Sequence, residues 1–235
     1  MSIIKIFCVI LAFQHVSCLL APRQVVLYDR TNYGGMSLTL TDYSFNLGTQ
    51  YNYNDRAQSV CAIGIWIFYD DTSFGRGGSG RVQYVSNTGS QQYCFNLGDS
   101  VRGKLTSVRY GGHVTGLVES TFTLFEYTWF KGVAEEKFTA SKPSLSLSSR
   151  HQSIIITGTS SWTVYEGLNY TGASKCLSVS GNTNIITDIS SIQIRHSSLR
   201  SVRKGCTADA DVIIHLPSSP NVASNFENVA SNSTL

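Results

Sequence analysis

Apolar and aromatic residues occur along this chain in short runs rather than in long stripes. The runs are rich in Val, Ile, Thr, Tyr and Phe, and clusters of Gly, Asn, Asp and Ser separate them. β-branched and aromatic side chains favour strands, whereas Gly, Asn and Asp favour turns. Patterns with the period of a helix are scarce. The sequence therefore predicts an all-β protein built from sandwiches or barrels.

Two internal repeats subdivide the chain. The segment YSFNLG at residues 43–48 returns as YCFNLG at residues 93–98, which indicates a repeated structural unit. The second repeat is an aromatic residue, four residues, another aromatic, one residue and a glycine. It occurs at Tyr28, Tyr33 and Gly35, at Phe125, Phe130 and Gly132, and at Tyr165, Tyr170 and Gly172.

A fourth copy of the second repeat is imperfect. Tyr69 and Phe74 have the aromatic spacing, but Arg76 stands where the glycine belongs, between Gly75 and Gly77, which allows a re-registered hairpin. Each copy is followed by a serine that opens a later apolar strand; these serines are Ser59, Ser107, Ser153 and Ser191. Two stacked aromatics and a glycine in a conformation closed to other residues would suit a hairpin folded over a sheet.

Paired aromatics, glycine and downstream serine together resemble the signature of the βγ-crystallin family over residues 23–196. The resemblance implies two βγ-crystallin-type Greek-key β-sandwich domains with two motifs each. Domain one is expected at residues 23–112 and domain two at residues 120–196, joined by a short linker. Residues 197–235 are expected to be a largely disordered extension, because residues 217–235 are rich in Ser, Asn and Ala.

The first eighteen residues have the pattern of a secretory signal peptide. Lys5 precedes an apolar run from Ile6 to Phe13, and small or apolar residues stand at the predicted cleavage site. The run is too short for a membrane span, and no later stretch approaches the roughly 20 apolar residues that a spanning helix needs. We therefore expect a secreted, extracellular protein with no transmembrane segment.

Four cysteines remain after cleavage of the predicted leader: Cys61, Cys94, Cys176 and Cys206. An even number in an oxidising compartment favours disulfides over metal ligation. In the βγ-crystallins a strand of the second motif lies beside the last strand of the first. The resemblance thus implies a Cys61–Cys94 disulfide and leaves Cys176 to pair with Cys206, which would pin the following segment onto an edge strand of domain two.

The resemblance also raises calcium as a possible ligand. Family members often bind it through paired loops that read Asn or Asp twice, two variable residues, Ser or Thr, then Ser. Each site takes a side-chain oxygen from one loop and a hydroxyl and a carbonyl from its partner. The resemblance implies at most one useful site, in domain one, at Asn54, Asp55, Lys104 and Thr106. The complementary pair, Gly103 and Gln58, should be weak, and the alternative is that the loops only cap the sandwich.

The corresponding loops of domain two are expected at residues 148–153 and 186–191. Neither has a carboxylate at its first two positions, so no calcium site is expected there. Glycosylation is predicted at two sequons, which begin at Asn169 and Asn232.

Other chemistry finds little support in the sequence. The net charge is small and no strong basic cluster exists, so no nucleic-acid partner is expected. The histidines outside the predicted leader stand in separate contexts, and no serine has nucleophile-elbow spacing. The glycine-rich segment 75–80 matches a dinucleotide fingerprint in spacing, but no helix follows it. A flexible hairpin loop is the better interpretation.

We therefore expect a non-enzymatic structural or interaction protein whose partner is an extracellular protein or a glycan. The alternatives are a defence protein, a lectin-like carbohydrate binder, or the crystallin-like partner of a pore-forming toxin. The sequence leaves the oligomeric state open, including whether the two domains pair within one chain or between chains.

Overall fold

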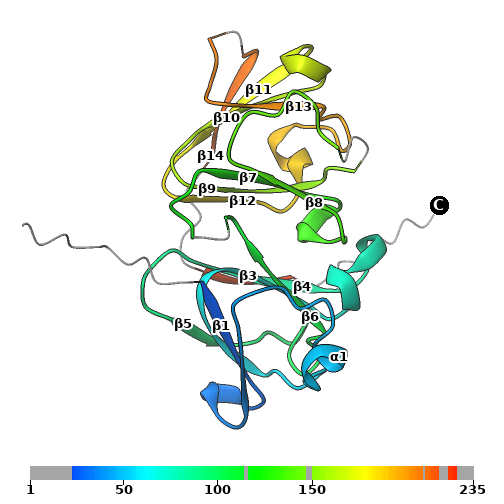
Figure 1. The fold of residues 1–235 in the computed structure, drawn as a ribbon, viewed down its shortest axis with the longest axis vertical. Helices are drawn as coiled ribbons and strands as arrows, with labels where there is room; N and C mark the ends of the chain where they lie inside the picture. Colours follow the sequence, from blue (N-terminus) through cyan, green and yellow to red (C-terminus); the bar gives the residue numbers. More distant parts are fainter. Residues whose placement is uncertain (1–22, 114–115, 147–149, 209, 217–221, 227–235) are drawn as a thin grey trace, which may run out of the picture.

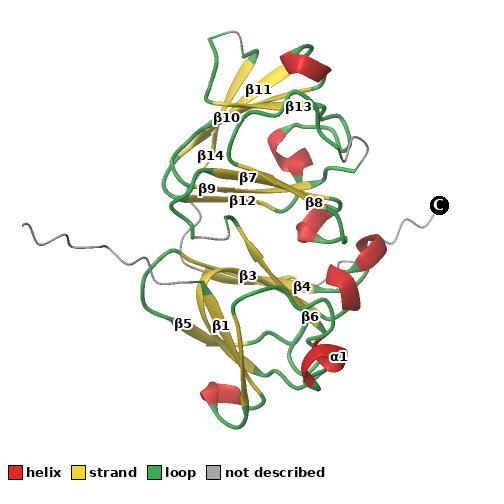
Figure 2. Cartoon of the chain, viewed as in Figure 1, coloured by secondary structure: helices red, strands yellow, loops and turns green. Residues whose placement is uncertain are grey.

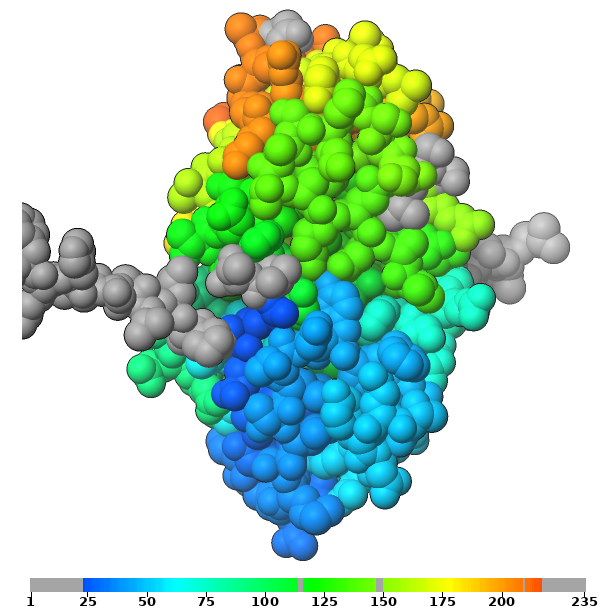
Figure 3. Space-filling model, viewed as in Figure 1, coloured from blue at the N-terminus to red at the C-terminus, as the bar shows by residue number. Residues whose placement is uncertain are grey.

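The computed structural model describes residues 23–113, 116–146, 150–208, 210–216 and 222–226. The predicted signal peptide and the sequon at Asn232 lie outside these residues. The described chain forms two lobes, domain one from the earlier residues and domain two from the later ones (Figure 3). Figure 2 shows that the helical segments are short turns between strands. In the part of the chain that is described, no helix is long and apolar enough to cross a membrane.

Six strands build domain one. They are β1 (Gln24–Tyr28), β2 (Ser37–Leu40), β3 (Ser59–Tyr69), β4 (Val82–Asn87), β5 (Tyr93–Asn96) and β6 (Ser107–Gly111). The long strand β3 serves two sheets: its first half lies between β1 and β5, and its second half lies between β4 and β6. Gly64, with φ 97°, stands where the strand passes from one sheet to the other. A short helix, α1 (Leu47–Tyr51), precedes β3.

Domain two has two four-stranded sheets. One contains β7 (Thr121–Phe125), β8 (Glu135–Phe138), β9 (Ser153–Thr157) and β12 (Thr183–Ile186). The other contains β10 (Trp162–Tyr165), β11 (Ser174–Val179), β13 (Ser201–Lys204) and β14 (Val212–Leu216). Between the sheets Phe122, Phe138 and Trp162 contact one another, with ring centroids 5.4–5.8 Å apart.

Each domain exchanges a strand between its two motifs. In domain one β5, from motif two, pairs with the motif-one half of β3. In domain two β12, from motif four, pairs with β9 of motif three. This exchange is the Greek-key arrangement that the resemblance implied, and the predicted all-β fold is confirmed.

Part of the C-terminal segment that was expected to be disordered, residues 197–235, is folded into strands. Ser201–Lys204 forms β13 and pairs with β10, while Val212–Leu216 forms β14 and pairs in parallel with β11. Leu199, Val202 and Leu216 are buried in the core of domain two. The expected domain end at residue 196 is therefore too early, because these later apolar residues complete the core. A last strand, β15 (Val222–Phe226), pairs with β4 of domain one.

The two domains pack against each other within one chain. The sheet containing β3, β4 and β6 faces the sheet containing β7, β9 and β12 (Figure 1). One apolar cluster spans this boundary and contains Ile65, Ile67, Tyr69, Phe74, Val82, Phe125, Phe130 and Ile155. Burial of this shared surface stabilises the pairing of the domains.

Candidate functional site

All four hairpins fold back in the same way. The paired aromatics contact each other with centroids 6.3 Å apart for Tyr28 and Tyr33 and 5.8 Å apart for Tyr69 and Phe74. The corresponding distances in domain two are 5.2 Å for Phe125–Phe130 and 5.8 Å for Tyr165–Tyr170. In each copy the second aromatic and the residue before it have positive φ. The aromatic residues predicted from the repeat are therefore the folded corners of the hairpins.

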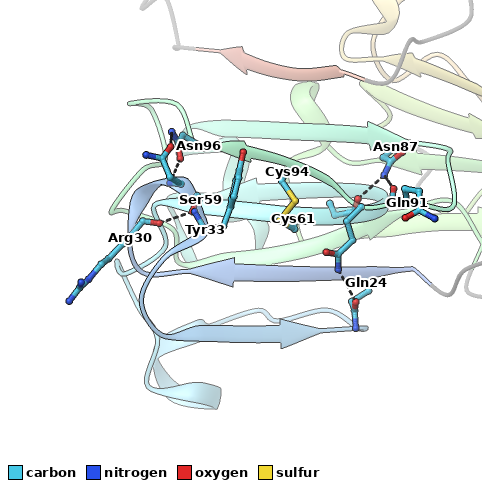
Figure 4. The surroundings of a disulfide bond; sticks show 12 residues. Gln24, Arg30, Tyr33, Ser59, Cys61, Asn87, Gln91, Cys94 and Asn96 are labelled. Carbon is cyan, nitrogen blue, oxygen red and sulfur yellow. Dashed lines mark hydrogen bonds between the residues drawn. A yellow bond between two sulfur atoms is a disulfide. The ribbon is translucent and has the colours of Figure 1, made fainter.

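A buried serine hydroxyl locks each corner. Ser59 accepts the backbone N–H of Tyr33 at 2.9 Å and donates to the carbonyl of Arg30 at 2.6 Å (Figure 4). The same pair of hydrogen bonds is made by Ser107 in motif two and by Ser153 in motif three. The serine thus satisfies two backbone groups that the sharp turn leaves without a partner.

The prediction that Ser191 locks the motif-four hairpin is wrong. Ser191 is exposed and lies in a 3-10 turn, Ile189–Ile192, rather than at the start of a strand. Ser201 takes the predicted role, because it accepts from the N–H of Tyr170 at 3.0 Å and donates to the carbonyl of Gly167 at 2.7 Å. An apolar residue follows Ser191 in the sequence, as it follows the other motif serines, but the chain continues for ten residues beyond Ser191 before the last motif strand begins.

Motif two is re-registered, as its missing glycine allowed. Gly75, with φ 68°, ends the turn directly after Phe74, one residue earlier than the repeat requires. An additional turn, Arg76–Gly78, follows it. The hairpin remains locked by Ser107, so the change alters only the loop that leads into β4.

The two loops that precede the locking serines of domain one lie side by side. Asp55 and Gly103 hold the second position of their loops and have left-handed backbones, with φ 57° and 66°. The N–H of Asp55 donates to the carbonyl of Leu105 at 3.1 Å, and the N–H of Gly103 donates to the carbonyl of Ala57 at 2.8 Å. Reciprocal hydrogen bonds thus hold the loops together with approximate two-fold symmetry.

This pairing brings three of the predicted ligand oxygens together. The hydroxyl of Thr106 lies 3.4 Å from Oδ1 of Asp55 and 3.2 Å from the carbonyl oxygen of Lys104. One carboxylate, one hydroxyl and one carbonyl form an all-oxygen donor set, which suits calcium. Among the described residues no three His, Cys, Asp or Glu side chains cluster in a way that could hold a metal. The candidate site therefore depends on a single carboxylate and neutral oxygens.

Two other predicted residues have supporting positions. The amide nitrogen of Asn54 donates to Oδ2 of Asp55 at 2.7 Å and so orients the carboxylate. The ammonium group of Lys104 donates to the carbonyl of Asp99 at 3.2 Å, while the carbonyl of Lys104 faces Thr106. The positive charge of Lys104 is thus engaged outside the cluster of three oxygens.

In domain two the described residues repeat the motif-four half of this loop geometry without the ligands, while residues 148 and 149 of the motif-three loop lie outside the described residues. Ser197 has φ 63° and donates its N–H to the carbonyl of His151 at 3.3 Å, which matches the bonds of Asp55 and Gly103. The motif-four loop is therefore residues 196–201, not 186–191 as expected. Gln152 and Arg200 stand at the positions of the ligand hydroxyl. The corrected loop lacks a carboxylate, as the expected one did at its first two positions.

Asp188, in the loop first assigned to motif four, has a different role. Its Oδ1 accepts from the N–H of Ser190 at 2.8 Å and lies 2.7 Å from Nε2 of His196. Burial opposes ionisation of this carboxyl group, but the hydrogen bonds from His196 and Ser190 outweigh it, so the pKa of Asp188 lies below its usual value. Asp188 caps the 3-10 turn that displaces the motif serine.

Both predicted disulfides are present. Cys61 on β3 is bonded to Cys94 on the neighbouring strand β5, with α carbons 4.0 Å apart (Figure 4). Cys176 on β11 is bonded to Cys206, with α carbons 5.2 Å apart. The second bond attaches the segment after β13 to β11. That strand is not at the sheet edge as expected, since β14 covers its outer side.

Comparison with known proteins gives a structural likeness. No family model and no curated protein matches the sequence. Among solved structures, Geodin, a βγ-crystallin from Geodia cydonium, superposes with a TM-score of 0.59 at 21% identity, covering 78% of this chain and 99% of Geodin. A βγ-crystallin from an archaeon has a TM-score of 0.32 at 23% identity, covering 36% of this chain and 96% of its own. One from Ciona intestinalis has a TM-score of 0.29 at 23% identity, covering 37% and 99%.

The likeness to Geodin extends over both domains and agrees with the exchanged strands and the four locked hairpins. At 21% identity it concerns the fold alone. This chain has the βγ-crystallin fold, with two Greek-key domains in tandem.

Proposed function

We propose that the protein is a non-enzymatic extracellular module that binds one calcium ion in domain one. The observation that carries the proposal is the convergence of the Asp55 carboxylate, the Thr106 hydroxyl and the Lys104 carbonyl. These oxygens come from two loops that are held together by their own backbone hydrogen bonds. The loops therefore present the donors without first having to fold around the ion.

The affinity expected for this site is low. Calcium takes six to eight oxygen ligands, and its affinity rises with the number of charged ligands and the rigidity of the site. Only Asp55 supplies a carboxylate here, so water must complete the coordination shell. A dissociation constant on the order of 10⁻⁴–10⁻³ M, the range of extracellular calcium modules, is the appropriate expectation.

Calcium titration calorimetry on the chelator-treated protein tests this function. Wild type should give a binding isotherm with one site, and Asp55→Ala should give no heat beyond dilution. Thr106→Val, which removes the hydroxyl but keeps the shape of the side chain, should weaken binding. Asp188→Asn is the matched control, because it removes an acidic group from domain two and should bind like wild type. Absence of heat from correctly folded wild type would remove the proposal.

An extracellular location is supported by the leader pattern and the two disulfides. Asn169 is exposed at a hairpin corner of domain two, with φ 52°, and its exposure supports glycosylation at this sequon. Treatment of the secreted protein with an amidase that removes N-glycans should lower its mass, and Asn169→Gln should remove the part of that change that arises at this site.

A further inference from the structure

An open cleft of about 550 Å³ lies where the two domains meet. Domain one contributes Ser73, Arg76 and Gly77 from the turns between β3 and β4, and domain two contributes Glu126, Tyr127, Val133, Ala134 and Arg150. Figure 1 shows these turns of domain one beside the turn that follows β7. The backbone N–H of Gly132 donates to the carbonyl of Phe74 at 2.9 Å and fixes the contact. The volume of the cleft is within the range of small-molecule binding sites.

Arg76 and Gly77, from the glycine-rich segment at residues 75–80, line one side of this cleft. A side-chain β carbon on Gly78 would lie 3.2 Å from the ring of Tyr127, and Gly78 also has φ 84°. A β carbon on Gly75 would lie 2.5 Å from the carbonyl oxygen of Ser79. Glycine at position 78 lets the loop lie close to Tyr127, and glycine at position 75 permits the tight turn before Ser79. The segment is thus a shaped wall of an interdomain cleft.

The charges in the cleft are arranged unequally. Arg76 is exposed, and no described residue pairs with its guanidinium group. Arg150, in contrast, lies 2.7 Å from Oε1 of Glu126 and donates to the hydroxyl of Tyr127 at 3.4 Å. The side chain of Glu126 is only 13% exposed. The cleft therefore offers one unpaired cation beside an oriented carboxylate–guanidinium pair, with Tyr127 and exposed Val133 as apolar surface.

We propose that this cleft binds an acidic saccharide, a sugar ring that bears a carboxylate. Arg76 would pair with the carboxylate in the two-pronged geometry that guanidinium groups favour. Glu126 and Arg150 would take neighbouring hydroxyls as acceptor and donor, and Tyr127 and Val133 would contact the apolar face of the ring. The site is separate from the proposed calcium site and goes beyond that function.

The composition of the cleft favours a saccharide over other anions. Glu126 would repel a peptide with several carboxylates, whereas a sugar with one carboxylate can place hydroxyls against it. The walls are open and carry charged side chains beside the apolar ones, which does not suit a purely apolar ligand. Uronic and sialic acids share the required carboxylate on a sugar ring, so separate probes must distinguish them.

Binding measurements on the purified full chain in the presence of a chelator test the proposal. The probes are a hyaluronan tetrasaccharide, 3′-sialyllactose and neutral chitotetraose. We expect at least one acidic probe to bind about tenfold more tightly than chitotetraose, the effect of one charge-assisted pair. Arg76→Gln should remove this preference, and Arg76→Lys should restore part of it. Arg30→Gln, which changes an exposed arginine outside the cleft, should bind as wild type does.

A second variant tests the cleft independently of charge. Ala134→Leu places a larger side chain on its wall and should weaken acidic and neutral probes alike. Asp55→Ala should leave saccharide binding unchanged, so loss of the calcium function and loss of the saccharide function are distinguishable. Equal binding of acidic and neutral probes, no binding of any probe, or unchanged binding by Arg76→Gln would overturn the proposal.

Discussion

The guanidinium group of Arg109, on the last strand of domain one, donates hydrogen bonds to the carbonyl oxygens of Phe130 and Gly132 in domain two. The bond to Gly132 measures 3.1 Å, and the arginine side chain is fully buried. The hydroxyl of Tyr69 also donates to the Phe130 carbonyl, at 2.6 Å, and burial raises the pKa of that hydroxyl above its usual value. These bonds join the corner of the motif-three hairpin to the sheet of domain one.

Replacing Arg109 should therefore weaken the pairing of the domains. Arg109→Met keeps much of the side-chain volume but removes the donor to the Gly132 carbonyl. It also leaves the partly buried carboxylate of Glu135 with Lys137 as its remaining cation among the described residues. We expect the free energy of unfolding to fall by about 3 kcal/mol. Urea unfolding followed by fluorescence measures this, with Arg30→Gln as the exposed control. A variant as stable as wild type would show that the buried arginine does not stabilise the interface.

Because Ser201 rather than Ser191 locks the motif-four hairpin, replacing the two serines should affect stability differently. Ser201→Ala leaves the N–H of Tyr170 and the carbonyl of Gly167 without their shared partner, so unfolding free energy should fall by about 1–3 kcal/mol. Ser191→Ala removes an exposed hydroxyl and should change it by less than about 0.5 kcal/mol. Urea unfolding of the two variants compares the sites directly. A larger loss for Ser191→Ala would restore the original assignment.

Acid should destabilise the protein partly through Asp29. The hydrogen bond from Arg56, at 2.8 Å, holds the pKa of Asp29 below its usual value of 3.8 in the folded state. The unfolded chain therefore binds the proton more readily than the folded chain does. The stability that ionised Asp29 contributes is fully present above the unfolded pKa, and it is lost as pH falls through the folded pKa. Urea midpoints measured from pH 6 to pH 2 should fall less steeply for Asp29→Asn than for wild type. Identical slopes would contradict this assignment.

The spacing of the aromatic residues predicted most of the fold. Tyr28 and Tyr33, for example, meet edge to face at a hairpin corner, and that contact requires a fixed interval in the sequence. Ser201 lacked such a signal, because the Asp188-capped turn inserts residues between β12 and the motif-four loop. Residues 212–216 read VIIHL, a β-branched pattern typical of a strand. The polar composition of the residues beyond them hid this signal.

The candidate calcium ligands could be named from sequence because their loop positions are fixed by the locking serines. The buried arginine and the cleft between the domains could not be predicted from the sequence. The burial of Arg109 depends on which faces of the two sheets meet, and the cleft beside Tyr127 exists only once the domains are packed. Neither contact is local in sequence, so no pattern of neighbouring residues encodes it.

The most direct test of the account is the number of calcium ions bound at saturation, counted by native mass spectrometry on wild type and on Asp55→Ala. One ion should bind to wild type and none to Asp55→Ala, while Asp188→Asn should retain its single ion. Two or more ions on wild type, or one ion on Asp55→Ala, would contradict a single site built from Asp55, Thr106 and Lys104.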